Sequence, residues 1–133
     1  MKILFDTSAL IAFANKEKPA KKIKEIVQAV EKGKINGIIS GITLTEIIYI
    51  VGRKSEQKAF NIIAFVEESR LEIIGCTKDL FVAAGHIKMK YKEKNLSIAD
   101  CIIIATAVNE KADEVLSLDR GWQGIKEIKL AEI

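Results

Sequence analysis

Residues 2–8 read Lys-Ile-Leu-Phe-Asp-Thr-Ser, a short apolar run that ends abruptly in three polar residues. The apolar part is typical of a buried strand, and from residue 9 to residue 13 the apolar side chains follow a helical spacing. The chain therefore begins with a strand that leads at once into a helix. Asp6 stands at the junction, and the rest of the sequence decides what lies beside it.

The alternation of strand and helix continues along the chain. Helical patterns cover residues 19–33, 43–52, 55–69, 77–94 and 97–109, and strand-like runs cover residues 36–40, 71–74, 115–118 and 125–130. Proline at the start of the first of these helices, and serine or threonine at the start of the others, suit helix N-termini. The last strand alternates polar and apolar residues and is expected at an edge of the sheet.

Strands that alternate with helices predict parallel pairing, because right-handed crossovers place the helices on both faces of a central sheet. The expected fold class is therefore α/β: a three-layer α/β/α domain with a central, mainly parallel sheet of four to five strands. With 133 residues and 14.7 kDa, the chain is long enough for one continuous core. We therefore expect residues 1–133 to form a single domain.

Composition excludes several classes of function. One histidine and two cysteines, Cys76 and Cys101, are too few for a zinc cage or a disulfide framework. Both cysteines have apolar neighbours and suit a reducing, cytoplasmic environment. We expect no signal peptide and no membrane association, because no apolar run approaches the roughly 20 residues that cross a bilayer. The net charge of +3 is compatible with a polyanionic partner without requiring one.

Four acidic residues stand in apolar surroundings, where an isolated charge is unfavourable. Asp6 follows the first strand and Asp119 follows the strand at residues 115–118, so both are expected at the carboxyl ends of parallel strands. Glu46 and Asp100 are expected in the first turns of helices that begin near the same edge. Open α/β sheets bind ligands at this edge. The four carboxylates are therefore candidates for one shared site.

Each of these acids also has a structural explanation. Glu46 follows Thr43, and Asp100 follows Ser97, at the spacing of a capping box, in which the acid side chain bonds to the backbone at a helix N-terminus. The other two acids suit a helix cap and a turn. We favour the shared site because the topology brings all four acids to one edge of the sheet.

Clustered carboxylates raise one another's pKa values unless a cation neutralises them. Oxygen ligands without histidine or cysteine favour a hard ion such as Mg²⁺ or Mn²⁺. Such an ion lowers the pKa of a bound water, orients the water and offsets charge on a leaving oxygen. Phosphodiester hydrolysis then needs neither a histidine nor a serine nucleophile, so this reaction is the one that the acids predict.

The four acids lie in a series of short motifs: Asp6-Thr7-Ser8, Glu46 within an apolar helix, Ser97-Ile98-Ala99-Asp100, and Ser117-Leu118-Asp119-Arg120-Gly121-Trp122. In order and spacing, and over nearly the whole chain, this series resembles the PIN-domain ribonucleases, in particular the small prokaryotic VapC-type toxins. The resemblance implies a Mg²⁺- or Mn²⁺-dependent endoribonuclease that hydrolyses RNA. It also implies a homodimer that is inhibited by a cognate antitoxin encoded beside it.

The resemblance assigns roles to individual residues. It implies that Asp6 and Asp100 are the principal metal ligands, that Glu46 and Asp119 complete the acidic pocket, and that Thr7 or Ser117 contacts water or phosphate.

Two positions depart from the family pattern. Trp122 stands where the family often has phenylalanine, which we interpret as a change in packing. Arg120 and Gly121 provide no fifth acid, which leaves open whether the site holds one metal ion or two.

Two lysine-rich segments, residues 16–24 and 88–94, are candidates for contact with RNA phosphates, although lysine-rich faces are common on solvated helices. Tyr91 and Trp122 are candidates for stacking on bases, although core packing is the more common use of such side chains.

Two other functions remain open at this point. The first alternative is a non-catalytic module with a PIN-like fold that binds RNA or protein. The second is a phosphoacceptor signalling domain, which matches less well because such domains pair adjacent acids after the first strand, where this chain has Asp6-Thr7-Ser8.

Overall fold

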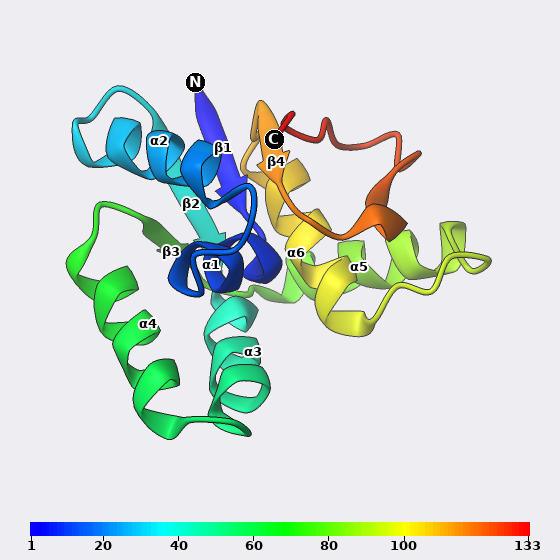
Figure 1. Cartoon of the computed structure of the whole chain (residues 1–133). Helices are drawn as coiled ribbons and strands as arrows, with labels where there is room; N and C mark the ends of the chain where they lie inside the picture. The colour runs from blue at the N-terminus through cyan, green and yellow to red at the C-terminus, as the bar shows by residue number, and fades with distance from the viewer.

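The computed structural model describes the whole chain, Met1–Ile133, as four strands and six helices (Figure 1). The strands are β1 (Lys2–Phe5), β2 (Asn36–Ser40), β3 (Glu72–Ile74) and β4 (Glu114–Leu116). The helices are α1 (Thr7–Ala14), α2 (Ala20–Glu31), α3 (Gly41–Gly52), α4 (Glu56–Glu68), α5 (Lys78–Lys90) and α6 (Ile98–Asn109). A 3₁₀ turn, η1 (Arg120–Trp122), follows β4. None of the helices is both long enough and apolar enough to span a membrane.

The four strands form one parallel sheet in the order β3-β2-β1-β4. β1 is central because its apolar residues suit burial on both faces: Leu4 lies opposite Ile38 of β2 and Val115 of β4, and all three are buried. Since the strands are parallel, their carboxyl ends meet at a single edge of the sheet. Asp6 follows β1 directly at this edge.

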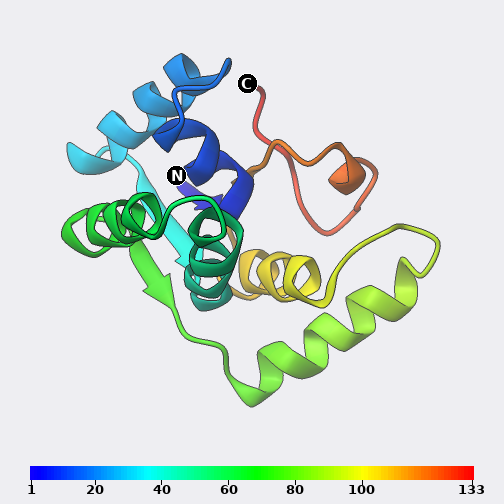
Figure 2. The same ribbon diagram turned by 60° about the horizontal axis from the view of Figure 1, so that its bottom comes forward.

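Helices cover both faces of the sheet, so the three-layer α/β/α prediction is confirmed (Figure 2). Successive residues of a strand point to opposite faces. Accordingly, Ile3 and Phe5 of β1 pack in a core cluster with residues of α1, α2, α3 and α4, whereas Leu4 packs in a second cluster with residues of α5 and α6.

The prediction of an edge strand at residues 125–130 is wrong. This segment makes one isolated parallel bridge, between Val115 and Leu130, supported by hydrogen bonds from the Val115 N–H to the Lys129 carbonyl and from the Ala131 N–H to the Val115 carbonyl. Its apolar residues, such as Ile125, instead pack into the cluster beneath α5 and α6. The alternating pattern therefore reflects a loop whose apolar residues are buried in the second core cluster, and the sheet has four strands.

Most helix boundaries follow the local capping signals. Ser55, Thr77 and Ser97 each accept a hydrogen bond from a backbone N–H three residues later, as expected for N-caps. α5 ends at Lys90, earlier than the expected residue 94, because the chain turns there and the Lys94 N–H donates to the Tyr91 carbonyl.

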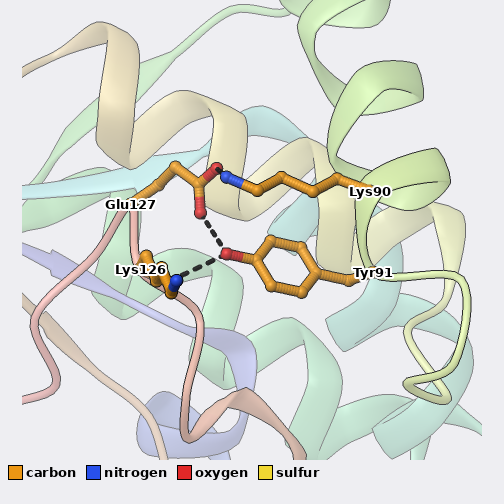
Figure 3. A network of polar contacts seen from close by, with 4 residues as sticks. All are labelled: Lys90, Tyr91, Lys126 and Glu127. Carbon is orange, nitrogen blue, oxygen red and sulfur yellow. Dashed lines mark hydrogen bonds and ion pairs between the residues drawn. The ribbon is translucent and has the colours of Figure 1, made fainter.

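The segment that follows η1 is tied to the end of α5 by polar side chains (Figure 3). Glu127 accepts a hydrogen bond from Lys90 Nζ at 2.8 Å and another from the Tyr91 hydroxyl, which itself accepts one from the Lys126 N–H at 2.9 Å. Partial burial alone would raise the pKa of Glu127, but the hydrogen bonds from Lys90 and Tyr91 outweigh it and lower this pKa. The contacts hold the C-terminal segment against the link that leads into α6.

Replacing Tyr91 with phenylalanine tests this attachment. The variant keeps the ring and loses both hydrogen bonds of the hydroxyl, so we expect a loss of roughly 1 kcal/mol in unfolding free energy. Hydrogen exchange at the Lys126 amide should also become faster, which amide exchange measured by NMR would detect. Tyr49→Phe is the matched control, because the Tyr49 ring contacts Arg53 and its hydroxyl makes no hydrogen bond within the chain. Equal exchange at Lys126 in Tyr91→Phe and the wild type would contradict the assignment.

Candidate active site

Asp6 is buried where β1 passes into α1, with 4% of its surface exposed. Its backbone N–H continues the sheet by donating to the Leu116 carbonyl at 2.9 Å. Its side chain makes no capping hydrogen bond to α1. Instead, Oδ2 accepts hydrogen bonds from the hydroxyls of Ser8, at 2.7 Å, and Ser117, at 2.8 Å. Asp6 is thus the N-cap residue of α1 by position, as the helix-cap explanation expects, but its side chain does not cap the helix, and its carboxylate is held from two sides.

Burial raises the pKa of Asp6. The hydrogen bonds from Ser8, Ser117 and the Thr7 backbone act against this rise, and the nearby charge of Asp100 adds to it. A buried carboxylate under these conditions is stabilised by a nearby cation.

Glu46 lies in α3, buried, and its Oε1 accepts a hydrogen bond from Thr7 Oγ1 at 2.7 Å. Thr7 Oγ1 also lies 3.1 Å from Thr43 Oγ1. The predicted capping box of Thr43 and Glu46 is wrong, because α3 begins directly after β2 with Ser40 as its N-cap. Glu46 therefore stands in the second turn of the helix, and Thr43 bonds across to α1.

Asp100 forms the predicted capping box with Ser97 at the start of α6. The Ser97 N–H donates to Asp100 Oδ2 at 2.9 Å, and the Asp100 N–H donates to Ser97 Oγ at 3.0 Å. The structural explanation is thus confirmed for this residue, yet it occupies only one carboxylate oxygen. Oδ1 accepts no hydrogen bond within the chain and stays available to a ligand.

Asp6, Glu46 and Asp100 influence one another electrostatically. Burial raises the pKa of Glu46, the hydrogen bond from Thr7 lowers it, and the charges of Asp6 and Asp100 both raise it. Asp100 also raises the pKa of Asp6. Asp6 at the β1–α1 junction, Glu46 in α3 and Asp100 in α6 therefore lie close enough for their charges to interact.

Asp119 stands apart from this group. Its side chain is exposed, and its Oδ1 accepts a hydrogen bond from the Gly121 N–H at 2.8 Å, which confirms the turn explanation. It does not contribute to the raised pKa of Asp6 or Glu46. Its backbone is nevertheless tied to the site, because the Asp119 N–H donates to Ser117 Oγ at 3.1 Å.

The donor set suits a hard divalent cation. Asp6, Glu46 and Asp100 offer carboxylate oxygens only, and Mg²⁺ takes one or two such ligands while it keeps several waters. No three acidic, histidine or cysteine side chains converge closely enough to enclose an ion by themselves. The fit therefore rests on the chemistry of the oxygens and on their shared neighbourhood.

Sequence reasoning missed two residues with side chains at the site, Ser8 and Thr43. Ser8 bonds to Asp6, and Thr43 contacts Thr7, which holds Glu46. The motif Asp6-Thr7-Ser8 contained a signal for Ser8, but serine near a helix start usually has a local role.

The lysines of residues 88–94 serve mainly within the chain. Lys88 Nζ donates to the Leu96 carbonyl, Lys90 Nζ to Glu127, and Lys94 Nζ to the Gln123 carbonyl. These bonds secure the α5–α6 link and weaken the case that this segment contacts RNA.

The two aromatic residues proposed for base stacking also serve the fold. The hydroxyl of Tyr91 bonds to Glu127, and Trp122 is 1% exposed within the second core cluster. The indole N–H of Trp122 has no partner, so this ring fills space as phenylalanine would.

Asp6→Asn should stabilise the protein at pH 7 in the absence of divalent ions, by about 1 kcal/mol. Because folding raises the pKa of Asp6, the native state binds a proton more tightly than the unfolded state, so wild-type stability falls as pH rises from about 4 through the raised pKa. Asparagine keeps the shape without the charge. The melting temperature in EDTA should therefore exceed that of the wild type by roughly 3–5 °C at pH 7, and by less at pH 4.

Glu67→Gln, on the exposed surface of α4, provides the control for this measurement. If the difference in melting temperature between Asp6→Asn and the wild type stayed constant from pH 4 to pH 7, the raised pKa of Asp6 would be contradicted.

The sequence profile of the PIN domain matches residues 3–128. Among solved structures, the chain is similar to VapBC2 from Rickettsia felis, bound to a DNA fragment from its promoter, with a TM-score of 0.78, 22% identity and 98% of each chain covered. It is also similar to VapC20 from Mycobacterium tuberculosis, a toxin that cleaves the sarcin–ricin loop, with a TM-score of 0.81, 16% identity, and 96% of this chain and 98% of that chain covered.

A toxin–antitoxin complex from Klebsiella pneumoniae has a TM-score of 0.71 and 24% identity, with 95% of this chain and 94% of that chain covered. No curated protein matches the chain significantly. At these identities, what the chain shares with the solved structures is the fold, with its parallel sheet between two layers of helices.

Proposed function

The chain belongs to the PIN domain family, and we propose that it is a divalent-metal-dependent endoribonuclease, the toxin of a toxin–antitoxin pair. One observation carries the proposal: at the carboxyl edge of a parallel sheet, buried Asp6 is followed by Thr7, whose hydroxyl bonds to Glu46, and the charge of Asp100 raises the pKa of both acids. The sarcin–ricin-loop-cleaving activity of a structurally similar toxin supports RNA as the substrate. Two free cysteines support a reducing, cytoplasmic location.

Asp6 and Asp100 would hold Mg²⁺ or Mn²⁺, and Glu46 would complete the acidic pocket. The same role for Asp119, whose exposed side chain stands apart from these acids, stays a prediction. The ion, when bound, supplies a water of lowered pKa and stabilises charge on the leaving oxygen. Glu46 Oε1 is occupied by the Thr7 hydroxyl, so Oε2 is the atom free to orient a water or accept its proton. The proposed contacts of Thr7 and Ser117 with substrate stay predictions, since both hydroxyls donate to acids within the chain.

Asp6→Asn and Asp100→Asn should each reduce Mn²⁺-dependent cleavage of RNA by about 100-fold or more, because each removes a charge that holds the ion. Cleavage of a labelled single-stranded RNA with Mn²⁺ and with EDTA measures the effect, and circular dichroism checks the fold. Glu67→Gln is the matched control.

Undiminished cleavage by both asparagine variants would refute the catalytic assignment. If the wild type bound RNA without cutting it in Mn²⁺, the alternative of a non-catalytic binding module would take its place.

A cognate antitoxin is proposed as the protein partner, since similar solved structures include toxin–antitoxin complexes. A hollow of about 400 Å³ between α1 and α4 offers a place for it, with Phe13 and Phe65 in its lining. An adjoining hollow of about 690 Å³ carries Lys16, Lys54 and Lys58, none of which forms a salt bridge. Apolar and cationic surfaces side by side suit an acidic amphipathic segment of the partner.

Changing Lys16, Lys54 and Lys58 together to glutamate should weaken binding of the antitoxin by at least roughly 10-fold, because it reverses the charge of the cationic hollow. Calorimetry with the product of the adjacent reading frame measures the affinity. Lys24→Glu with Lys32→Glu and Lys34→Glu, on exposed residues of α2 and of the link to β2, changes the net charge by the same amount and is the control. If the triple lysine variant and the control bound the antitoxin with equal affinity, the antitoxin would bind elsewhere.

A homodimer is also proposed. Phe81, Met89 and Ile98 expose apolar surface along α5 and α6 and surround a hollow of about 400 Å³, which supports contact with a second copy. Light scattering after size-exclusion chromatography measures the oligomeric state.

A further inference from the structure

A single oxygen of Asp6 receives two hydroxyl protons from elements far apart in the sequence. Ser8 in α1 donates to Oδ2 at 2.7 Å, and Ser117 after β4 donates to the same atom at 2.8 Å. The two serine oxygens lie 3.5 Å from each other. Since a hydroxyl carries one proton, each serine has committed its only donor to this carboxylate.

The backbone after β4 fixes the orientation of both hydroxyls. The Leu118 N–H donates to Ser8 Oγ at 2.9 Å, and the Asp119 N–H donates to Ser117 Oγ at 3.1 Å. With these N–H groups filling an acceptor position on each oxygen, the hydroxyl protons point toward Asp6. Two short hydrogen-bond chains thus run from successive amides, through two serines, to one carboxylate oxygen.

This arrangement leaves the two oxygens of Asp6 in different states. Oδ2 accepts both hydroxyls, whereas Oδ1 accepts no side-chain hydrogen bond and is the atom available to an ion. Groups that hydrogen-bond a ligating carboxylate fix its orientation and strengthen metal binding. A buried carboxylate depends most on these hydrogen bonds, because water does not hold it in place.

We propose that Ser8 and Ser117 are positioning residues that hold Asp6 in the orientation required to bind a divalent cation. The inference rests on the proposed function, because it concerns the same site. It assigns Ser8 a role that the sequence did not suggest, and it places the hydroxyl of Ser117 on Asp6 before any contact with substrate. It also links the loop that carries Asp119 to the orientation of Asp6.

The test compares Mn²⁺ affinity, measured by electron paramagnetic resonance of the free ion, in serine variants of the full chain. Ser8→Ala and Ser117→Ala should each weaken Mn²⁺ binding about 10-fold or more. Ser8→Thr, which keeps the hydroxyl, should restore binding to within about threefold of the wild type, since the half-buried Ser8 position retains its donor.

Ser69→Ala is the matched control. Ser69 Oγ likewise donates one hydrogen bond, to the Val66 carbonyl, and accepts one, from the Leu71 N–H, but it lies at the end of α4 away from the acids. If the serines at the site only stitched the chain together, all three alanine variants would lose stability and keep Mn²⁺ affinity. If Ser8 and Ser117 position Asp6, only Ser69→Ala keeps wild-type Mn²⁺ affinity.

Wild-type affinity in both Ser8→Ala and Ser117→Ala would overturn the inference and leave the proposed nuclease intact. A wild-type chain that binds no Mn²⁺ would overturn the metal-dependent function itself. Should Ser117→Ala fail to fold, the comparison of Ser8→Ala with Ser8→Thr decides the question at the more exposed position.

Discussion

β1 lies between β2 and β4 and pairs with both in parallel. This pairing places the carboxyl ends of the three strands, which are distant in sequence, at one edge of the sheet. Phe5 is level with Leu116, and the next backbone N–H, that of Asp6, donates to the Leu116 carbonyl. β1 and β2 then turn into helices almost at once, since α1 begins at Thr7 and α3 at Gly41. The abruptness of these junctions brings the polar residues of α1 and α3 within hydrogen-bonding distance.

Buried acids at this edge conflict with the requirements of a stable core. Desolvation disfavours the charged forms of Asp6 and Glu46, the charge of Asp6 makes Glu46 harder to ionise, and the charge of Asp100 does the same to both. Hydroxyls of Ser8, Ser117 and Thr7 offset part of this cost without adding charge. Neutral donors stabilise the carboxylates yet leave their negative charge uncompensated, which is the state that attracts a cation. A local sacrifice of stability of this kind is typical of functional sites.

The sequence predicted those features that depend on local patterns. Alternating strands and helices gave the layers, and Ser97 with Asp100 formed the expected capping box because both partners lie within one turn. The start of α3 was misplaced at Thr43, because a strand that enters a helix without a loop leaves no turn residues to mark the boundary. Likewise, the role of Ser8 depends on Leu118, 110 positions away, and no local pattern reports such a contact.

The parallel pairing that builds the site also sets the order in which a growing chain acquires it. Asp6 leaves the ribosome before Ser117, its hydrogen-bond partner, which follows 111 residues later. At about 5–20 residues per second, this separation corresponds to a delay on the order of ten seconds. During this interval β1 lacks its β4 neighbour, so the acids have no finished crevice to share. A nascent chain that does not yet include Ser117 therefore lacks the complete set of hydrogen bonds around Asp6.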